Sequence, residues 1–284
     1  MPSIACVNGM FSAPEEARVP IEDRGYLFGD GVYETMRCYQ GRVWALDRHL
    51  VRLERSLREI AIPTALIPSI REWIDEGARR SGLWDALVYV QVTRGVAPRQ
   101  HTFSSDLIPN VVMTMRATAG VSEVDRASGV RAITLPDQRW ERRDIKSINL
   151  LPNILAKQRA HDAGAFEAIL VEPDGRVTEG SSTNVFAVFG DTLQTAPSDH
   201  HILGGITRDL VLGLARREGI PVQETVFNID QLRSAREIFL SGTTTEALGV
   251  TTLDGSPVAD GAVGPITRRL FAAFEECVRG GCDG

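Results

Sequence analysis

The chain has 284 residues, of which 43% are hydrophobic and 24% charged, and its formal net charge is −6. This is the composition of an ordinary globular protein long enough for two domains, and the acidic balance with scattered basic residues argues against a nucleic-acid partner. No apolar run approaches the ~20 residues of a membrane span, and the N-terminus lacks the basic start and apolar core of a signal peptide, so we expect a cytoplasmic protein without a membrane partner.

The first part of the chain is predicted to alternate strands with helices. Apolar stretches of strand length occur at residues 4–7, 31–39, 42–46, 86–93 and 110–116. Asp47 can cap a helix, because leucines recur after it at spacings of three and four up to Ile60. A second helix is predicted over residues 69–80 and ends at Ser81-Gly82.

The second part is richer in strands. Residues 118–129 carry few large apolar side chains, and we interpret them as a linker between an N-terminal domain, residues 1–117, and a C-terminal domain, residues 130–284. Beyond the linker, strands are predicted at residues 130–135, 168–172, 176–179, 184–189, 192–196, 222–226 and 237–240. Helices are predicted at residues 151–163, 208–219, 230–234 and 265–278. So many strands favour two α/β domains with mixed (α+β) sheets over one doubly wound sheet.

Lys146 is the first candidate for chemistry. The chain has 31 lysines and arginines, of which only Lys146 and Lys157 are lysines. An arginine cannot form an imine, whereas a desolvated lysine can bind an aldehyde cofactor through its amine. The apolar residues Ile148, Leu150 and Leu151 follow shortly after Lys146, which favours a half-buried amine. The alternative is a surface pair with Asp144 or Glu141.

Glu179 is the second candidate, in the segment Val177-Thr-Glu-Gly-Ser-Ser-Thr-Asn184. A single carboxylate there can accept a hydrogen bond from a ring nitrogen of a cofactor and keep that nitrogen protonated. Ser181 and Ser182 offer hydroxyl donors to a phosphate. The alternative is a surface turn.

Two further segments suit a phosphate. Leu203-Gly-Gly-Ile-Thr207 runs directly into a predicted helix, whose N-terminal amides and dipole favour an anion. The hydroxyl cluster Ser241-Gly-Thr-Thr-Thr245 can complete the same site. The alternative for the first segment is an ordinary helix cap by Thr207.

Arg99 and His101 form the last candidate pair. Alternate residues of an extended stretch face the same side, so the two side chains can converge on a carboxylate, which arginine binds through both oxygens. The alternative is a solvated loop. His200-His201 raises the question of a metal, but no third ligand is spaced for it, so we expect no metal site.

Together these segments resemble the class IV aminotransferases, which are fold-type IV pyridoxal-phosphate enzymes. The resemblance runs nearly end to end and is densest at residues 22–34, 92–101, 144–150, 155–158 and 178–184. Within the family, the Pro98-Arg-x-His101 element resembles the branch that acts on D-amino acids. The resemblance implies a small N-terminal α/β domain, a larger C-terminal domain with a barrel-like mixed sheet, and a cytoplasmic homodimer.

The resemblance also implies a role for each matching residue. Lys146 is similar to the lysine that forms the Schiff base with pyridoxal 5′-phosphate and shuttles the proton, and Glu179 to the partner of the pyridine nitrogen. The other cofactor-binding residues implied are Arg52, Ser181, Ser182, Leu203, Ile206, Thr207, Thr243 and Thr244. The substrate carboxylate would be bound by Tyr33, Arg99 and His101, the last two delivered across a dimer interface. Arg139 would support the site near the lysine. Glu34 and His49 would contact the binding residues and not the ligands themselves.

The implied activity is ping-pong transamination between a D-amino acid and a 2-oxo acid, of the type D-alanine/D-glutamate with pyruvate/2-oxoglutarate. Two alternatives with the same fold are an L-branched-chain aminotransferase and an aminodeoxychorismate lyase. A departure from the family is Gly242, where relatives carry a hydroxyl residue.

Overall fold

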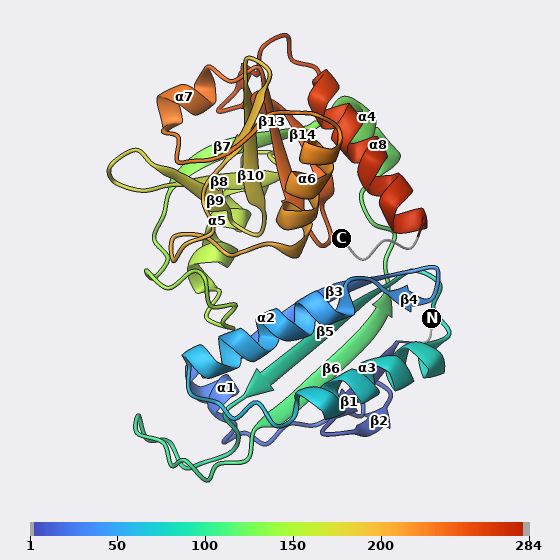
Figure 1. The fold of residues 1–284 in the computed structure, drawn as a ribbon. Helices are drawn as coiled ribbons and strands as arrows, with labels where there is room; N and C mark the ends of the chain where they lie inside the picture. The colour runs from blue at the N-terminus through green and yellow to red at the C-terminus, as the bar shows by residue number, and fades with distance from the viewer. Residues whose placement is uncertain (1–2, 281–284) are drawn as a thin grey trace. The chain divides into compact units, whose positions relative to one another are not determined.

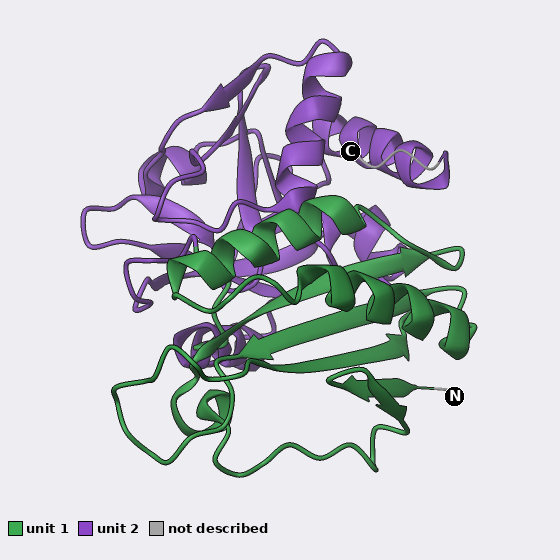
Figure 2. Cartoon of the chain, turned by 60° about the horizontal axis from the view of Figure 1, so that its bottom comes forward, with its two compact units in different colours: residues 1–119, 145–149 green, residues 120–144, 150–284 purple. Residues whose placement is uncertain are grey.

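A computed structural model describes residues 3–280 of the chain, which divides into two compact units. Unit 1 comprises the residues up to Ala119 together with Ile145–Asn149, and unit 2 comprises Gly120–Asp144 and the residues from Leu150 onward (Figure 2). The chain therefore returns to unit 1 for five residues that include Lys146, whereas the sequence analysis assigned them to the C-terminal domain. In the described part of the chain, no helix combines the length and the apolar character that a bilayer span requires.

Unit 1 is an antiparallel sheet with helices packed on it. Its strands follow the order β2-β1-β6-β5-β3-β4. They are β1 (Ile4–Val7), β2 (Met10–Ser12), β3 (Gly31–Tyr39), β4 (Arg42–Val43), β5 (Ala86–Thr93) and β6 (Asn110–Ala117). The helices are α1 (Arg24–Phe28), α2 (Leu46–Glu59) and α3 (Ile67–Ser81), and α2 and α3 cover the same face of the sheet (Figure 1).

The core of unit 1 lies between this face and the two helices. Alternate residues of β5 (Val88, Val90 and Val92) are fully buried, and they meet Leu53 and Leu57 of α2. Burial of each such side chain stabilises the fold by about 1.5–3 kcal/mol. The alternation leaves the other residues of the strands on the opposite face, which is the face that carries Tyr33 and Tyr89.

Unit 2 is built on a larger mixed sheet in the order β12-β11-β10-β13-β14-β7-β8-β9, with β15 beside β14. The strands are β7 (Val130–Pro136), β8 (Glu167–Val171), β9 (Val177–Gly180), β10 (Asn184–Phe189), β11 (Thr192–Thr195), β12 (Val222–Glu224), β13 (Glu237–Gly242), β14 (Glu246–Leu253) and β15 (Ser256–Pro257). Strand pairs β7/β8, β7/β14 and β11/β12 are parallel, and the other pairs are antiparallel.

The helices of unit 2 are α4 (Glu123–Ser128), α5 (Leu151–Asp162), α6 (Ile206–Arg217), α7 (Ile229–Arg233) and α8 (Pro265–Arg279). Helix α8 packs against β13 and β14, α6 packs against β13 and α8, and α5 packs against β7 and β8 (Figure 1). The central strands β10 and β13 are buried along nearly their whole length, so both faces of the sheet are covered there.

Several predicted elements differ from those observed. The predicted strand at 42–46 is only two residues long, because Ala45 has a positive φ of 52° and α2 already begins at Leu46. Ala45 is therefore the N-cap, and Asp47 lies in the first turn instead of capping the helix. Within the predicted linker, α4 forms an ordered helix capped by the Ser122 side chain. Strands β2, β14 and β15 and helix α1 were not predicted from the sequence.

Candidate active site

The predicted catalytic lysine lies beside the start of β3 in unit 1. The backbone of Ile145–Asn149 runs along this strand: Tyr33 N donates to Lys146 O (3.0 Å), and Ile148 N donates to Gly31 O (3.1 Å). Lys146 Nζ lies 4.4 Å from the centroid of the Tyr33 ring, which in turn lies 5.6 Å from the Tyr89 ring. Asp144, which the alternative interpretation paired with Lys146, accepts hydrogen bonds from Arg142. The half-buried amine thus rests on an aromatic face.

Glu34, on the opposite face of β3, is fully buried and holds two residues of α2. Arg52 donates to both carboxylate oxygens through Nε and Nη2, each at 2.7 Å, and His49 Nδ1 lies 2.7 Å from Oε2. Burial alone would raise the pKa of Glu34, but the charge and hydrogen bonds of Arg52, helped by His49, hold it well below its usual range. Arg52 is thereby oriented by an ionised carboxylate.

His49 is held as a neutral ring. Burial lowers its pKa, and the hydrogen bond to Glu34 only partly opposes this effect. A neutral ring that donates from Nδ1 to Glu34 carries its lone pair on Nε2, and this buried atom has no hydrogen-bond partner within residues 3–280. The expected supporting roles of Glu34 and His49 therefore concern Arg52.

Glu179, in β9 of unit 2, is a buried carboxylate with three donors. Arg139 Nη1 forms a short ion pair with Oε1, while Asn184 Nδ2 (3.1 Å) and Leu203 N (3.0 Å) donate to Oε2. Burial raises the pKa of Glu179, and the guanidinium of Arg139 opposes the rise. Since a carboxylate accepts about four hydrogen bonds, a further donor such as a ring N–H can be accommodated.

Arg139 was expected to support the lysine. In unit 2, its ion-pair partners are the carboxylates of Glu179 and Asp137. Besides Glu179 it binds Asp137, whose two oxygens accept from Arg139 Nε (3.0 Å) and Nη2 (2.8 Å). Asp137 also accepts from Thr178 Oγ1 at 2.9 Å. Sequence reasoning missed Asp137, because nothing in the chain around it separates it from an ordinary turn residue.

Ser181 and Ser182 are held by a second buried carboxylate, Glu167, which the sequence analysis did not single out. Ser181 Oγ makes a short hydrogen bond to Oε1, and Ser182 Oγ (3.0 Å) and Thr183 Oγ1 (3.0 Å) donate to Oε2. Both predicted cofactor hydroxyls therefore already have an acceptor. Glu167 fixes the turn that follows Glu179, and it is fully buried at the start of β8.

The N-terminus of α6 meets the ends of β10 and β13. Its N-cap is Gly205, which provides no side-chain cap, so Thr207 is not the cap, although Ile206 and Thr207 are buried in the first turn. Asn184 lies against Gly205 and pairs with Ser241 in the sheet. Ser241 Oγ is fully buried without a hydrogen-bond partner within the described residues.

The predicted Thr243 and Thr244 lie in the turn between β13 and β14. A Cβ at Gly242 would meet its neighbours at 3.6 Å or more, which is ordinary van der Waals contact. The backbone at 242 thus has room for a Cβ, and glycine is not required there. Uncapped helix amides, an unpartnered buried hydroxyl and nearby threonines are the donors that a phosphate needs.

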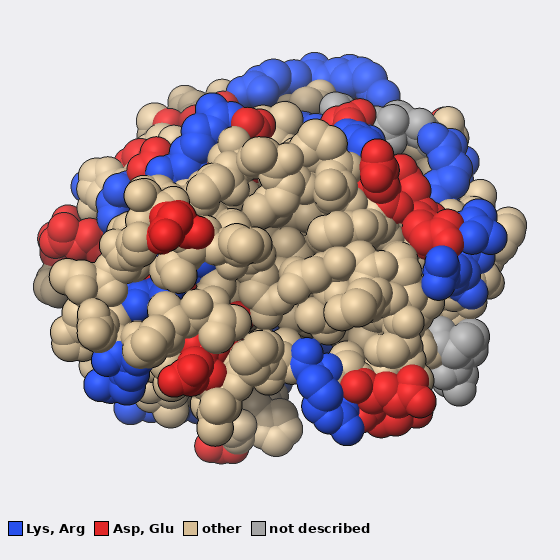
Figure 3. Space-filling model, turned by 90° about the horizontal axis from the view of Figure 1, so that it is seen from below, with Lys and Arg blue, Asp and Glu red and all other residues tan. Residues whose placement is uncertain are grey.

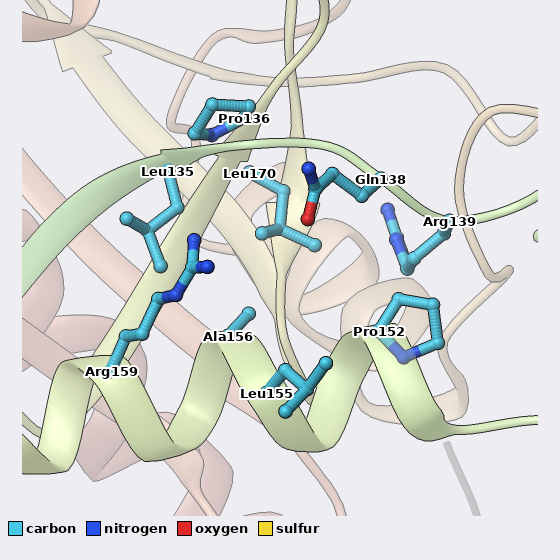
Figure 4. A pocket seen from close by; sticks show the side chains of 9 residues that line it. All are labelled: Leu135, Pro136, Gln138, Arg139, Pro152, Leu155, Ala156, Arg159 and Leu170. Carbon is cyan, nitrogen blue, oxygen red and sulfur yellow. The ribbon is translucent and has the colours of Figure 1, made fainter.

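A small groove lies behind Arg139, between the end of β7 and α5 (Figure 4). Its lining is mostly hydrocarbon, with Gln138 and Arg139 at one end and Arg159 of α5 at the other. It is lined by Leu135, Pro136, Gln138, Arg139, Pro152, Leu155, Ala156, Arg159 and Leu170. The guanidinium of Arg139 therefore contacts Glu179, while another part of the side chain lines this groove.

Arg99 and His101 lie on the exposed loop between β5 and β6 of unit 1. The His101 ring packs edge-on against Phe28, with centroids 5.7 Å apart, and Arg99 Cζ lies 5.1 Å from the centroid of the same ring. The structure thus brings both side chains to one aromatic residue.

On the face drawn in Figure 3, acidic and basic side chains are intermixed around the margin and do not gather into a basic patch.

The histidine pair has a third candidate ligand after all. Ligand atoms of Asp199, His200 and His201 lie within 4.8 Å of one another, and the sequence analysis had overlooked Asp199. His201 Nδ1 is, however, already 3.0 Å from Glu172 Oε1, and Arg143 pairs with the same carboxylate. A guanidinium at this position disfavours a cation.

Comparison with known proteins identifies the class. The family described as amino-transferase class IV matches residues 31–253, so the chain belongs to the class IV aminotransferases. Enzymes of this family use pyridoxal phosphate. Both the family and the fold expected from the sequence are confirmed.

The relatives narrow the class further. The chain is 42% identical over 276 residues to a D-alanine aminotransferase of Bacillus licheniformis, covering 95% of each protein. It is 40% identical to a D-alanine aminotransferase of Staphylococcus epidermidis, over 96% of this chain and 97% of the relative. Among solved structures, the Escherichia coli branched-chain amino acid aminotransferase is similar, with a TM-score of 0.89 and 26% identity over 98% of this chain and 93% of that one. The branched-chain aminotransferase of Thermoproteus uzoniensis, solved with norvaline, has a TM-score of 0.88 and 27% identity, over 98% of this chain and 95% of that one.

Proposed function

We propose that the protein transfers an amino group from a D-amino acid, such as D-alanine or D-glutamate, to a 2-oxo acid, such as 2-oxoglutarate or pyruvate. The observation that carries the proposal is the 42% identity, over nearly the full length, to a D-alanine aminotransferase, against 26–27% to the branched-chain enzymes. The cofactor is pyridoxal 5′-phosphate. The groups described above fit it: an amine on an aromatic face, a buried carboxylate that accepts hydrogen bonds, and uncapped helix amides beside a buried hydroxyl.

Each group of residues has a distinct task. When bound, the cofactor supplies an aldehyde that takes up amines and a ring that withdraws electrons from the carbon attached to the nitrogen. Lys146 Nζ would bind the aldehyde of the cofactor, and its free amine would accept the substrate α-proton and donate a proton on the same face. Glu179 would accept the ring N–H, and Arg139 favours the charged form of that carboxylate and holds it in place.

The phosphate and the ring are held by the remaining predicted residues. The first-turn amides of Ile206 and Thr207 and the guanidinium of Arg52 compensate the charge of the phosphate. Thr243 and Thr244 add hydroxyl donors, and Leu203 packs on the ring. Ser181 and Ser182 act through their backbone and through the turn that Glu167 holds, since their hydroxyls donate to that carboxylate.

The substrate carboxylate is bound by Arg99 and His101, with Tyr33 as a third donor. Arg99 provides a bidentate guanidinium, which suits a carboxylate better than an ammonium does. Handedness follows from this contact. With the carboxylate fixed, only one enantiomer presents its α-hydrogen to Lys146 Nζ. The same proposal includes a homodimer in which the partner subunit supplies Arg99 and His101. It also includes a cytoplasmic location.

An L-branched-chain aminotransferase is the second candidate, favoured by the high TM-scores to those enzymes. It would keep the cofactor residues and bind the carboxylate differently. A donor panel of D-alanine, D-glutamate, L-leucine and L-glutamate with 2-oxo acid acceptors separates the two. We expect turnover with the D-amino acids; turnover confined to L-leucine would refute the proposal.

The assignment of Lys146 is tested with a matched pair of variants. Lys146→Ala is expected to abolish transamination and the absorbance of the lysine-bound cofactor. Lys157→Ala is the control, because Lys157 Nζ donates to the Phe166 carbonyl and approaches Glu167. Retention of wild-type turnover by Lys146→Ala, or equal loss in both variants, would contradict the assignment.

A further inference from the structure

The long loop between β5 and β6, residues 94–109, carries Arg99 and His101 and has almost no regular structure. Loops of this length in compact domains are usually functional, and they position side chains only if they are anchored elsewhere. Pro98, Gln100 and Thr102 are not buried, and Arg99 and His101 are exposed beside them. The hydrogen bonds that fix this part of the loop must therefore come from outside it.

The base of the loop is paired with the segment before α1. Arg24 N donates to Gly95 O (2.9 Å), and Ala97 N donates to Glu22 O (3.2 Å). Gly95 has a φ of 111°, and a Cβ there would lie 2.1 Å from Ile108 O, so only glycine allows the two sides of the loop to meet. These backbone bonds bring Arg24 beside the residues that precede the Arg99–His101 element.

The side chain of Arg24 then continues along the loop. It is only 3% exposed, and its Nη1 donates to Gln100 O (2.6 Å) while Nη2 donates to His101 O (3.3 Å). Its Nε donates to Asp30 Oδ2 at 2.8 Å. A planar guanidinium thus links two successive carbonyls of the loop to a carboxylate on the body of unit 1, a geometry that lysine cannot reproduce.

Asp30 is itself fixed by a second arginine. Arg94 donates to both of its oxygens, through Nε (2.8 Å) and Nη2 (2.9 Å). The same guanidinium reaches Ile60 O (2.7 Å) and Ala61 O (3.0 Å), just after the end of α2. The carboxylate between the two arginines is therefore linked, through Arg94, to the backbone just after α2.

Phe28, four residues after Arg24 on α1, completes the anchor. Its ring lies under the guanidinium of Arg24, 4.9 Å from Cζ, and it contacts both Arg99 and His101. Backbone and side chain of the Arg99–His101 element are thus held by one short helix.

We propose that Arg24, fixed by Asp30, is the positioning residue that presents Arg99 and His101 to the substrate carboxylate. The inference rests on the proposed role of these two side chains. Arg24 touches neither substrate nor cofactor in this scheme. It acts by holding the carbonyls of Gln100 and His101, so its loss should affect acids and spare amines that lack a carboxylate.

The test compares Arg24→Met with the wild-type holoenzyme on D-alanine and on D-alaninol, the amino alcohol without a carboxylate. We expect kcat/KM for D-alanine to fall about 10- to 100-fold, mainly through KM, as displacement of a positioning group by about 1 Å does. The half-reaction with D-alaninol should change less than about 3-fold. Arg24→Lys should give an intermediate loss. Arg18→Met is the matched control, since Arg18 donates to nearby carbonyls of its own exposed segment.

Phe28→Leu provides a second route if Arg24→Met does not fold. It leaves the Arg24–Asp30–Arg94 network in place and removes the ring under Arg99 and His101, so a smaller loss confined to D-alanine is expected. Equal losses on both substrates in the foldable variants, or no loss at all, would overturn the inference.

An Arg99→Ala background separates this inference from the proposed function. If Arg24 acts through the loop, most of the Arg24→Met effect on D-alanine disappears once Arg99 is absent; an undiminished effect overturns the inference. If Arg99→Ala alone weakens D-alanine and D-alaninol equally, the carboxylate-binding role of Arg99 fails, and the proposed function must be revised first.

Discussion

Removal of the Glu34 charge tests the buried network on α2. In Glu34→Gln, the guanidinium of Arg52 loses the carboxylate that holds it while staying largely buried, and His49 loses its charged acceptor. Breaking a buried ion pair by removing one partner costs about 3–5 kcal/mol, because the remaining charge is left uncompensated. We expect the free energy of unfolding at pH 7 to fall by this amount.

The stability difference between wild type and Glu34→Gln should also depend on pH, because Glu34 is buried against Arg52. The pKa of Glu34 is lowered on folding from its ordinary value of 4.5, so its contribution is complete above about pH 4.5 and is lost as the pH falls toward the folded pKa. The stability difference between wild type and Glu34→Gln should therefore shrink below pH 4.5 by roughly 1.4 kcal/mol per pH unit.

Urea unfolding followed by tryptophan fluorescence is the assay, since Trp44, Trp73 and Trp84 belong to unit 1 and only Trp140 to unit 2. Glu54→Gln is the control: Glu54 pairs with Arg58 on the surface of the same helix, and its loss should change stability by less than about 1 kcal/mol. A Glu34→Gln effect below about 1 kcal/mol, or one that stays constant between about pH 6 and about pH 3.5, would refute the reasoning.

Two further predictions concern the subunit partner and the phosphate site. If Arg99 acts across a homodimer interface, mixing inactive Lys146→Ala subunits with weakened Arg99→Ala subunits should raise D-alanine turnover above that of either variant alone, because the hybrid contains one complete site. No gain after verified subunit exchange would place Arg99 in the same subunit as its lysine. Gly205→Ala should weaken cofactor binding and stability, because a Cβ there would lie 2.1 Å from Asn184 Oδ1, whereas Gly213→Ala in the same helix meets nothing within 4 Å and should stabilise the protein by about 0.5–1 kcal/mol. Equal cofactor affinity and melting temperature in the two variants would contradict the packing at Gly205.

Much of the fold follows from local pattern. The strand at 31–39 and the strand at 86–93 were predicted with the boundaries observed, because alternation and turn residues define them without reference to the rest of the chain. Strand β14 was missed for the opposite reason. Its residues are buried on both faces, so they show no alternation, and they follow directly on the hydroxyl cluster that ends at Thr245.

The candidate site residues were also predicted from residue type. A rare lysine, a single carboxylate before small hydroxyl residues, and glycines before a helix are local signals, and they pointed to Lys146, Glu179 and the α6 N-terminus. What surrounds them depends on contacts between residues far apart in sequence. Only the tertiary structure decided that Glu167 takes the hydroxyls of Ser181 and Ser182, and that Asp137 holds Arg139.

The same holds for Arg24, which the folded chain brings to Gln100 and His101 across 76 and 77 positions. The physical reason is that hydrogen bonds and ion pairs carry no sequence period. A buried arginine or carboxylate reads like any surface charge until packing removes the water around it, and its partner is then whichever donor or acceptor the sheet topology has placed within about 3 Å.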